Sequence, residues 1–454
     1  MLDAISPLDG RYASATAPLR EFFSEFALIR ARAHIELRYL LEFDSTGVFP
    51  RLTAEERMRI EALEISFAAD DADKVKAAEK ITRHDVKALE FFLRDRLSLA
   101  APNRIHFGLT SEDVNNLAYG ILLDSFVRTV QRPAMKNLLG KLIEICEGGA
   151  AQPFPTRTHG QAASPSTAGK ELAVYIERFR RLGEKLVNVR FMGKCNGATG
   201  TWASWNAADP SLDWPGFFER FVAGLGLDFN PVTTQIEDHD SWAAYFNLVH
   251  QCNNVLIDLD QDIWLWLMEG WYCEEAAAGE IGSSTMPHKV NPIRFENSEG
   301  NLLLANALLG FFSDKLCRSR LQRDLSDSTV SRNIGVALGH SYLGFIETTH
   351  GLERLRLRPE RCIQDLERHL ELLAEPVQTI LRPAIQADPY VLLKELTRGK
   401  NFSRADLERF IAGLEVTSEV SVKLLNLTVS GYIGLAERIC REELERARAF
   451  LKTL

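Results

Sequence analysis

The stretch that decides the fold is WAAYFNLVHQCNNVLIDLDQDIWLW, residues 242–266. Its apolar residues recur every three or four positions, which puts them on one face of an α-helix. The stripe consists of Trp242, Tyr245, Val249, Cys252, Leu256, Leu259, Ile263 and Trp266. It continues for about seven turns at 3.6 residues each. Such a stripe is more often core than a cofactor-binding surface, so we predict a long helix that forms part of a core.

Other segments repeat this pattern. The same spacing occurs in residues 301–312, in residues 334–355 and at Leu172, Tyr175, Ile176, Phe179, Leu182 and Leu186. We find no convincing strand alternation outside short loops. Long helices with wide apolar faces pack in bundles with their neighbours or with other subunits. We therefore predict an all-α fold around a central long-helix bundle.

Breaks in the pattern predict three consecutive regions. The first, residues 1–110, ends at the Gly108-Leu109-Thr110 turn. The second, residues 111–357, contains the long helices and ends before Pro359. The third, residues 358–454, contains shorter helices, because prolines interrupt it at positions 376, 383 and 389.

The amino-acid composition limits the kinds of partner that this protein can bind. The net charge of −9 argues against a general nucleic-acid or anionic-membrane surface, which needs a basic face. An anionic substrate would need a local cluster of arginines and lysines. Seven dispersed cysteines without a CxxC pair indicate reduced thiols in a cytoplasmic protein.

The sequence gives no sign of a targeting or membrane segment. The start, MLDAISPLDGRYASA, carries an acid at position 3 and lacks the apolar run of a secretory signal. Residues 241–257 are too polar and too short to cross a bilayer. We expect a soluble, cytoplasmic protein.

The most informative stretch for chemistry is GSSTMPHKVNP, residues 282–292. Its glycine, serines and proline favour a loop. Asn291-Pro292 is typical of an N-cap followed by the first helical residue, so a helix should begin at Ile293 with its positive end toward Lys289. Hydroxyls, an ammonium and a helix terminus suit removal of a carbon-bound proton beside a carboxylate. A serine-rich linker before a capped helix explains the residues equally well.

Two earlier helix starts resemble capping boxes with aspartate as the acid. They are Thr82-Arg83-His84-Asp85 and Thr110-Ser111-Glu112-Asp113. Simple capping explains both. A helix N-terminus with hydroxyls is also an anion site, and the two interpretations can coexist.

Histidines are the candidate acids and bases, since they titrate near neutrality. His159 lies in a polar turn, TRTHGQ, before a helix expected from about Ala168. For His159, as for His106, a structural role is the commoner one. None of the ten histidines stands in a metal-binding spacing such as HExxH.

Two further segments have competing explanations. GKCNGATGT, residues 193–201, lacks the order of a phosphate loop, so a tight turn with close backbone approach is the better interpretation. A basic patch brackets Ser326-Asp327-Ser328-Thr329, and it is either a solvated face or a phosphate cradle. The patch consists of Arg318, Arg320, Arg323 and Arg332.

Taken together, these motifs resemble the fumarase/aspartase superfamily over nearly the whole chain. The 282–292 loop is similar to its signature GSSxMPxKxN, and residues 108–113 and 197–200 resemble its two other conserved regions. Details similar to the adenylosuccinate lyase branch are SPLDGRY at 6–12, His288, THGQ at 158–161 and KELTRGK at 394–400. Argininosuccinate lyases usually carry glutamine at the position of His288.

The resemblance implies roles for individual residues. Ser283 is the expected base that removes the Cβ proton, although a swap with Ser284 stays open, and His159 is the expected acid. Lys289 is expected to stabilise the aci-carboxylate. The residues expected to hold the succinyl carboxylates are Thr110, Ser111, Gln235 and Asn297. Those expected at the nucleotide end are Arg11, Tyr12, His84, Asp85, Val86, Arg323, Ser328, Thr329 and Arg332.

The resemblance also implies a three-domain homotetramer whose active sites are shared between subunits. It implies elimination of fumarate from adenylosuccinate, giving AMP, and from its imidazole-carboxamide analogue SAICAR, giving AICAR. Neither metal nor organic cofactor is implied. The alternatives are an argininosuccinate lyase and a catalytically silent crystallin-like relative, against which the intact Ser283, Lys289 and His159 argue. A P-loop nucleotide-binding module is a distant third.

Overall fold

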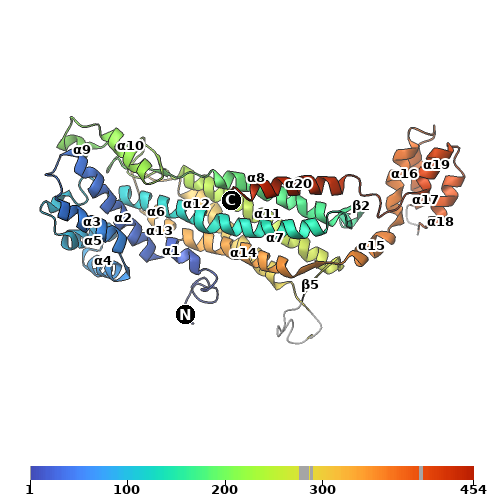
Figure 1. The fold of residues 1–454 in the computed structure, drawn as a ribbon, viewed down its shortest axis with the longest axis horizontal. Coiled ribbons are helices and arrows are strands. Elements are labelled where there is room, and N and C mark those ends of the chain that lie inside the picture. The colour runs from blue at the N-terminus through green and yellow to red at the C-terminus, as the bar shows by residue number, and fades with distance from the viewer. Residues whose placement is uncertain (1, 276–285, 287–289, 398–401) are drawn as a thin grey trace. The chain divides into compact units, whose positions relative to one another are not determined.

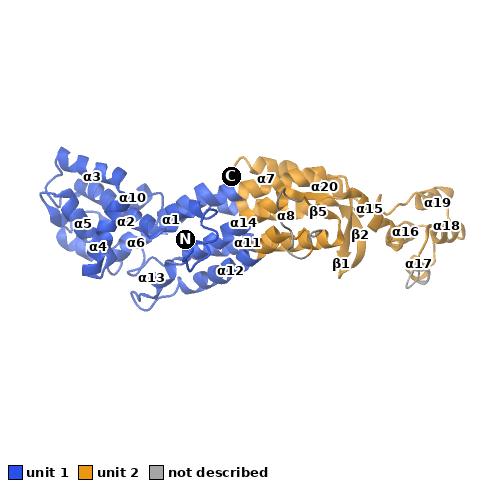
Figure 2. Ribbon diagram, turned by 90° about the horizontal axis from the view of Figure 1, so that it is seen from below, with its two compact units in different colours: residues 1–134, 184–254, 300–344 blue, residues 135–183, 255–299, 345–454 orange. Residues whose placement is uncertain are grey.

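The computed structural model describes residues 2–275, 286, 290–397 and 402–454. Helices dominate this part of the chain, as predicted (Figure 1). It divides into two compact units, each assembled from separate segments (Figure 2). Unit 1 consists of residues 1–134, 184–254 and 300–344, and unit 2 of residues 135–183, 255–299 and 345–454. The three consecutive domains expected from the sequence breaks remain a prediction.

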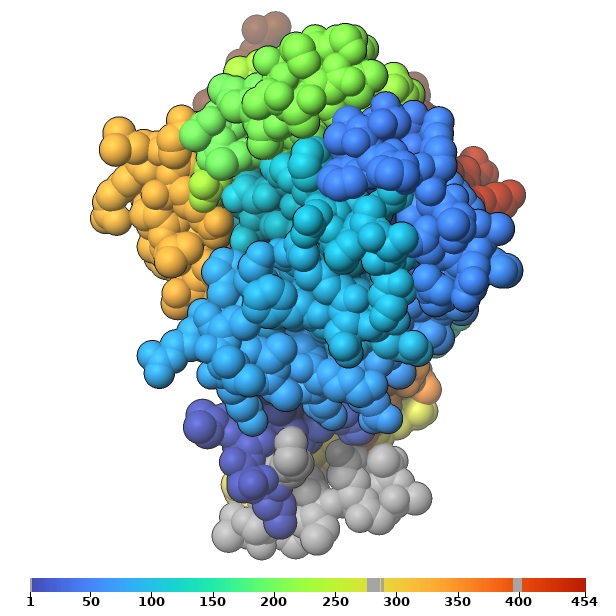
Figure 3. All heavy atoms as spheres, turned by 90° about the vertical axis from the view of Figure 1, so that its left-hand side faces the viewer, coloured from blue at the N-terminus to red at the C-terminus, as the bar shows by residue number. Residues whose placement is uncertain are grey.

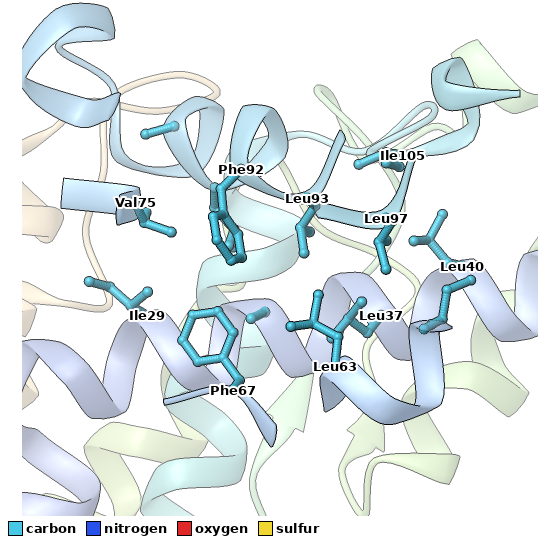
Figure 4. Close-up of a cluster of buried hydrophobic side chains, with 14 of the residues drawn as sticks. Ile29, Leu37, Leu40, Leu63, Phe67, Val75, Phe92, Leu93, Leu97 and Ile105 are labelled. Atoms are coloured by element: carbon cyan, nitrogen blue, oxygen red, sulfur yellow. The ribbon is translucent and has the colours of Figure 1, made fainter. Parts of the chain in front are cut away.

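The N-terminal part of unit 1 is a layer of helices around one apolar cluster (Figure 4). The helices that supply it are α2 (Glu25–Phe43), α3 (Ala54–Ser66), α4 (Ala69–Thr82) and α5 (Asp85–Leu97). Helices α1 (Arg20–Phe23) and α6 (Ser111–Phe126) pack against α2. Leu37, Leu63 and Leu93 are almost completely buried in the apolar cluster. The rings of Phe67 and Phe92 meet edge to face, with centroids 5.9 Å apart. This cluster holds the start of α5 against α2.

The rest of unit 1 adds three short helices and a short parallel strand pair. These elements are α9 (Ala203–Ala208), α10 (Trp214–Gly224), β3 (Met192–Gly193), β4 (Asp228–Phe229) and α13 (Ser326–Ser331). Figure 3 shows one face of the unit, where residues of α3 to α5 form most of the surface in blue and α10 borders it in green.

The long helices contribute residues to both units. They are α7 (Arg132–Gly148), α8 (Ala168–Val187), α11 (Asp240–Glu269), α12 (Ile293–Lys315) and α14 (Ile334–Arg354). A π-helical turn, Val127–Gln131, precedes α7. The predicted stripe of α11 is confirmed, because every one of its eight residues is at most 7% exposed. Helices α8 and α12 begin at Ala168 and Ile293, as predicted.

Polar side chains interrupt this apolar packing. In unit 1, Asn253 of α11 donates to Asn306 of α12 at 2.9 Å and accepts from Ser341 of α14 at 2.7 Å. In unit 2, Thr348 of α14 donates to Asp260 of α11 at 2.7 Å and lies 2.8 Å from the hydroxyl of Ser298 on α12. Each of these six residues is less than 10% exposed. Buried polar groups need such partners, because an unpaired one costs free energy.

Unit 2 contains strands that the sequence did not reveal. β1 (Pro153–Thr158) and β2 (Gln161–Thr167) form an antiparallel hairpin, and β5 (Tyr272–Glu274) pairs with β6 (Leu355–Leu357). The expectation that no convincing strand would occur outside short loops is wrong for the hairpin. Its prolines and small residues give no alternating apolar pattern.

The C-terminal helices of unit 2 form their own small core. They are α15 (Pro359–Glu367), α16 (Ala374–Leu381), α17 (Pro389–Thr397), α18 (Arg404–Ala412) and α19 (Ser418–Leu425). The last helix, α20 (Ala436–Phe450), instead contacts α7, where Cys440 Sγ lies 3.4 Å from Cys146 Sγ. Leu366, Val377, Leu407 and Leu424 belong to the buried cluster. None of the described helices is long and apolar enough to cross a bilayer.

Candidate active site

The predicted site residues are distributed over both units. Those of the expected nucleotide end, together with Thr110, Ser111 and Gln235, belong to unit 1, whereas His159 and Asn297 belong to unit 2. Ser283, Ser284 and Lys289 lie outside the described residues.

His159 occupies the tip of the β1–β2 hairpin. Thr158 pairs with Gln161, so the loop consists of His159 and Gly160 alone. Both have positive φ, 54° and 73°, which is the pattern of a type I′ turn. A left-handed conformation is unfavourable for a non-glycine residue. The hairpin therefore holds the exposed imidazole at its tip in a conformation that a free chain would seldom adopt.

Contacts with the C-terminal helices anchor this hairpin within unit 2. Arg157 pairs with Asp365 of α15 at 2.6 Å, and its guanidinium lies 4.9 Å from the ring centroid of Trp271. On the other strand, Ser164 bonds to Glu375 of α16. A cavity of about 670 Å³ lies beside this contact. Its lining includes Ser164, Glu375 and Thr158, the residue that precedes His159. The hairpin thus places His159 beside a cavity of substrate size.

The start of α5 carries three candidates and corrects one prediction. Thr82 is the last residue of α4, and Arg83 takes a left-handed conformation at φ 54°. His84 is the N-cap, since its Nδ1 accepts from the amide of Lys87 at 3.2 Å. The capping box predicted for residues 82–85 is therefore wrong, because Thr82 still belongs to α4 and the N-cap of α5 is His84.

Asp85 is the centre of a cluster of charges. Its Oδ2 lies 2.9 Å from Arg32 of α2 and 3.5 Å from Arg332, and its Oδ1 accepts from the amide of Val86 at 2.9 Å. Burial acts to raise the pKa of Asp85, but Arg32 and the Val86 amide outweigh it and lower the pKa. A cavity of about 200 Å³ is lined by Arg32, Asp85, Arg332 and Tyr119, among others. Val86 itself is buried in the core.

The predicted arginine patch does not act as one group. Arg318 and Arg320 are exposed and pair with Asp314 and Asp324 close by in the chain. Arg323 instead points inward to Glu112 at 3.0 Å, and its side chain is 13% exposed. Arg332 donates to Ser328 Oγ at 2.8 Å besides its pair with Asp85. Arg323, Ser328 and Arg332 thus remain as phosphate candidates, with Thr329 exposed on the same short helix.

At the N-terminus of α6, one of the two hydrogen bonds of the predicted capping box is present. Thr110 is the N-cap, and its amide donates to Asp113 Oδ2 at 2.9 Å. The other oxygen of Asp113 lies 2.8 Å from Lys194 Nζ and accepts from the amides of Asn196 and Gly197 at 3.1 and 3.2 Å. Both charged side chains are completely buried.

These bonds show what the glycine-rich segment 193–201 does. Asn116 of α6 bonds to both backbone groups of Lys194, and the Lys194 ammonium donates to the carbonyl of Gly197. Gly200 has φ 72°, and a Cβ there would lie 2.1 Å from the carbonyl oxygen of Thr233. The tight turn with close backbone approach is confirmed. Gln235, two residues after Thr233, donates to the carbonyl of Ala198 at 3.1 Å.

A stability prediction follows from the Asp113–Lys194 pair. Lys194→Met should lower the free energy of unfolding by about 3–5 kcal/mol, because it leaves a buried carboxylate without its countercharge. Arg190→Met is the matched control, since Arg190 and Asp228 form an exposed pair that contributes at most about 1 kcal/mol. Urea unfolding measures both. Equal losses would contradict a buried, stability-determining pair.

The remaining candidates lie on separate elements. Arg11 and Tyr12 belong to an N-terminal turn whose Leu8 packs against α14, so that a Cβ on Gly339 would lie 3.0 Å from it. Arg11 is exposed and Tyr12 half-buried. Asn297 is a half-buried residue of α12 in unit 2.

Sequence reasoning missed Arg32 and Glu112, which contact the candidates Asp85 and Arg323, and Asn115, which joins Arg32 to Glu112. Arg32 is 6% exposed and donates from Nε to Asn115 at 2.9 Å. A signal was available, because Arg32 lies between Leu28 and Ile35 on the buried face of α2. A charged residue on such a face needs a partner. Among the described residues, no group of His, Cys, Asp or Glu is arranged to hold a metal ion.

Comparison with known proteins gives matches along almost the whole chain. Residues 14–307 match the family model described as Lyase, and residues 319–433 match the model described as Adenylosuccinate lyase C-terminal. The adenylosuccinate lyase of Vibrio cholerae is 43% identical over 444 residues, covering 96% of this chain and 97% of that protein. The adenylosuccinate lyases of Haemophilus influenzae and Escherichia coli are 42% and 41% identical over 443 residues.

Solved structures show the same fold at low identity. The 3-carboxy-cis,cis-muconate lactonizing enzyme of Pseudomonas putida matches with a TM-score of 0.79 at 20% identity, over 96% of this chain and 97% of that one. A fumarate lyase from Mesorhizobium sp. BNC1 matches with a TM-score of 0.77 at 19% identity, over 94% and 97% of the two chains.

Proposed function

Since this chain belongs to the adenylosuccinate lyase family, we propose that it cleaves adenylosuccinate into AMP and fumarate, and SAICAR into AICAR and fumarate. The observation that carries this proposal is the near-full-length identity of 41–43% to three adenylosuccinate lyases. Both reactions are β-eliminations that break a carbon–nitrogen bond. The enzyme is a carbon–nitrogen lyase of purine nucleotide biosynthesis.

In the proposed reaction, Ser283 removes the Cβ proton of the succinyl group as an alkoxide. The electron pair moves into the adjacent carboxylate, and Lys289 stabilises the aci-carboxylate so formed. The Cα–N bond then breaks, and His159 gives its proton to the departing nitrogen. Thr110, Ser111, Gln235 and Asn297 hold the succinyl carboxylates in this scheme. A serine is a weak base in water, so exclusion of water and nearby cations must stabilise the alkoxide.

Two features of the structure support these roles. His159 is exposed at the tip of an anchored hairpin, where a substrate can reach it. Asp85 and Arg332 lie together at one cavity in unit 1, which suits the nucleotide end. There Arg323, Arg332, Ser328 and Thr329 would face the phosphate, and Arg11, Tyr12, His84, Asp85 and Val86 would surround the nucleoside.

We propose a homotetramer in which neighbouring chains complete each active site. The apolar surface of the long helices supports this assembly. On α12, Leu303, Leu304 and Phe311 are each about half exposed in the single chain, although the opposite side of this helix is buried. On α11, Trp264, Leu265 and Met268 are similarly exposed. Contiguous exposed apolar surface of this kind is typical of subunit interfaces.

A substrate assay tests the proposed function. The purified protein should release fumarate from adenylosuccinate, followed by the absorbance of the fumarate formed, and the rate should not change on addition of EDTA. The signature loop and the family relationship give this expectation. Release of fumarate from argininosuccinate instead would reassign the substrate, and no release from any of the three succinyl compounds would identify a silent relative.

The proposed location is the cytoplasm, the compartment of nucleotide biosynthesis. All seven cysteines are free thiols, as expected for a reducing environment. Neither a nucleic acid nor a membrane is a proposed partner.

A further inference from the structure

The two candidate phosphate arginines of unit 1 are joined by a continuous chain of polar contacts. Arg332 and Arg323 are its ends. Helices α2, α5 and α6, all in unit 1 (Figure 2), supply the residues between them. In order, the contacts are Arg332–Asp85 at 3.5 Å, Asp85–Arg32 at 2.9 Å, Arg32–Asn115 at 2.9 Å, Asn115–Glu112 at 3.3 Å and Glu112–Arg323 at 3.0 Å. The mechanism proposed above uses only Arg332, Asp85 and Arg323.

Within this chain of contacts, Glu112 is a deeply buried carboxylate. It is 5% exposed, and one carboxylate oxygen accepts from both Asn115 and Arg323. Arg323 meets a second buried carboxylate, because its Nε lies 4.0 Å from Asp327 Oδ2. That Nε is buried and makes no hydrogen bond within the described part of the chain. Glu112 therefore holds the Arg323 guanidinium in place from one side, and Asp327 faces its Nε from the other.

The charges around Arg323 create a problem for an anionic ligand. One guanidinium already faces two carboxylates, and a phosphate dianion would add two more negative charges. Other cations near Glu112 are engaged, since Lys194 pairs with Asp113 and Arg32 with Asp85. Like charges brought together at a buried site favour protonation of one of them. Glu112 is the suitable group, because it is 5% exposed and lies 3.0 Å from Arg323, whereas Asp327 lies 4.0 Å away.

We propose that Glu112 is a positioning residue that orients Arg323 and takes up one proton from solvent when the phosphate of a nucleotide binds there. This inference rests on the proposed function, which places the phosphate at Arg323. Binding converts the Glu112 carboxylate to the neutral acid, so the guanidinium charge becomes available to the phosphate. The groups that act on Glu112 are Arg323 and Asp327 from the α13 region, Asn115 and Tyr119 from α6, and Lys194 from the β3 segment. Arg32 of α2 reaches Glu112 only through Asn115.

The titration of Glu112 agrees with this role. Burial raises its pKa to about 7, against the opposing effect of Arg323. A bound phosphate would raise the pKa further, so proton uptake should be small well below pH 7 and approach one proton above it. The phosphate has its own pKa of about 6, so above pH 7 it is already a dianion. The phosphate itself therefore contributes little to the proton uptake.

Calorimetry with AMP tests the proposal. AMP is titrated into the intact protein at pH 7 and pH 8 in two buffers of different ionisation enthalpy, which gives the number of protons bound. The wild type should take up roughly half a proton at pH 7 and nearly one at pH 8. Glu112→Gln keeps an acceptor for Arg323 but cannot titrate, so its uptake at pH 8 should be close to zero. Adenosine, which lacks the phosphate, should cause no such uptake in either protein.

The possible outcomes separate the two proposals. If both proteins bind AMP with equal proton uptake, or if uptake by the wild type does not rise from pH 7 to pH 8, the role of Glu112 is wrong and the proposed function stands. If the wild type releases fumarate from adenylosuccinate but AMP binding takes up no proton, the conclusion is the same. If the wild type neither binds AMP nor cleaves adenylosuccinate, both proposals fail. The wild-type pH series alone decides the matter should Glu112→Gln not fold.

Discussion

Ser283→Ala should lower kcat for fumarate release by roughly 10²- to 10⁴-fold, the range that a general base contributes. The hydroxyl is the proposed base, and alanine has no group that can take the Cβ proton. KM should change little, because substrate binding depends on other residues. Steady-state kinetics with adenylosuccinate measures both parameters. Urea unfolding and native mass spectrometry should give wild-type results, since the change removes one hydroxyl.

Ser284→Ala is the matched control, because it removes the same group from the adjacent residue. It should cost far less activity than Ser283→Ala. An inactive Ser284→Ala enzyme beside an active Ser283→Ala enzyme would exchange the roles of the two serines. His159→Ala should lower kcat by a similar factor, since it removes the proposed acid.

Mixed tetramers of the two inactive variants should recover activity. Along the chain, His159 precedes the 20-residue helix α8, and Ser283 follows the 30-residue helix α11. A helix of 30 residues is about 45 Å long at 1.5 Å per residue. One chain therefore need not bring its own two residues together, and a site shared between chains can combine them. Random exchange between equal amounts of His159→Ala and Ser283→Ala should give about a quarter of the sites both intact residues.

The experiment dissociates the two variants in mild denaturant, mixes them and lets them reassociate. Fumarate release is then compared with that of each variant treated alone. Mixing without dissociation is the control and should leave activity at the level of the single variants. Mixed tetramers detected by native mass spectrometry that remain inactive would show that His159 and Ser283 act within one chain.

The helices could be predicted because burial repeats along them. The stripe of α11 and that of α8, from Leu172 to Leu186, have the spacing of one helix face, and the structure buries both except for Leu182, which is half-buried. The starts of α8 and α12 follow from local residues, a polar turn before Ala168 and Asn291-Pro292 before Ile293.

The β1–β2 hairpin and the chain of polar contacts from Arg332 to Arg323 could not be predicted, because their residues pair with partners that lie far away in the sequence. The β1–β2 pair has proline at positions 153, 155 and 165. The hairpin is anchored by contacts with Asp365 and Glu375, about 200 residues later in the sequence. Glu112 has the sequence appearance of an ordinary acid in the first turn of a helix. Its contact with Arg323 joins residues more than 200 positions apart, so only the fold reveals its importance.

The buried amide and hydroxyl contacts among α11, α12 and α14 determine which alignment of these helices is allowed. Leucine and valine side chains would tolerate a shift of one helix along another by a turn, because they pack with any similar neighbour. Asn253, Asn306 and Ser341 would not, since a shift would leave buried amides without partners. Replacing this trio with apolar residues of similar volume could raise stability while removing the penalty on shifted alignments. These contacts therefore act as a register lock that excludes competing arrangements of the bundle.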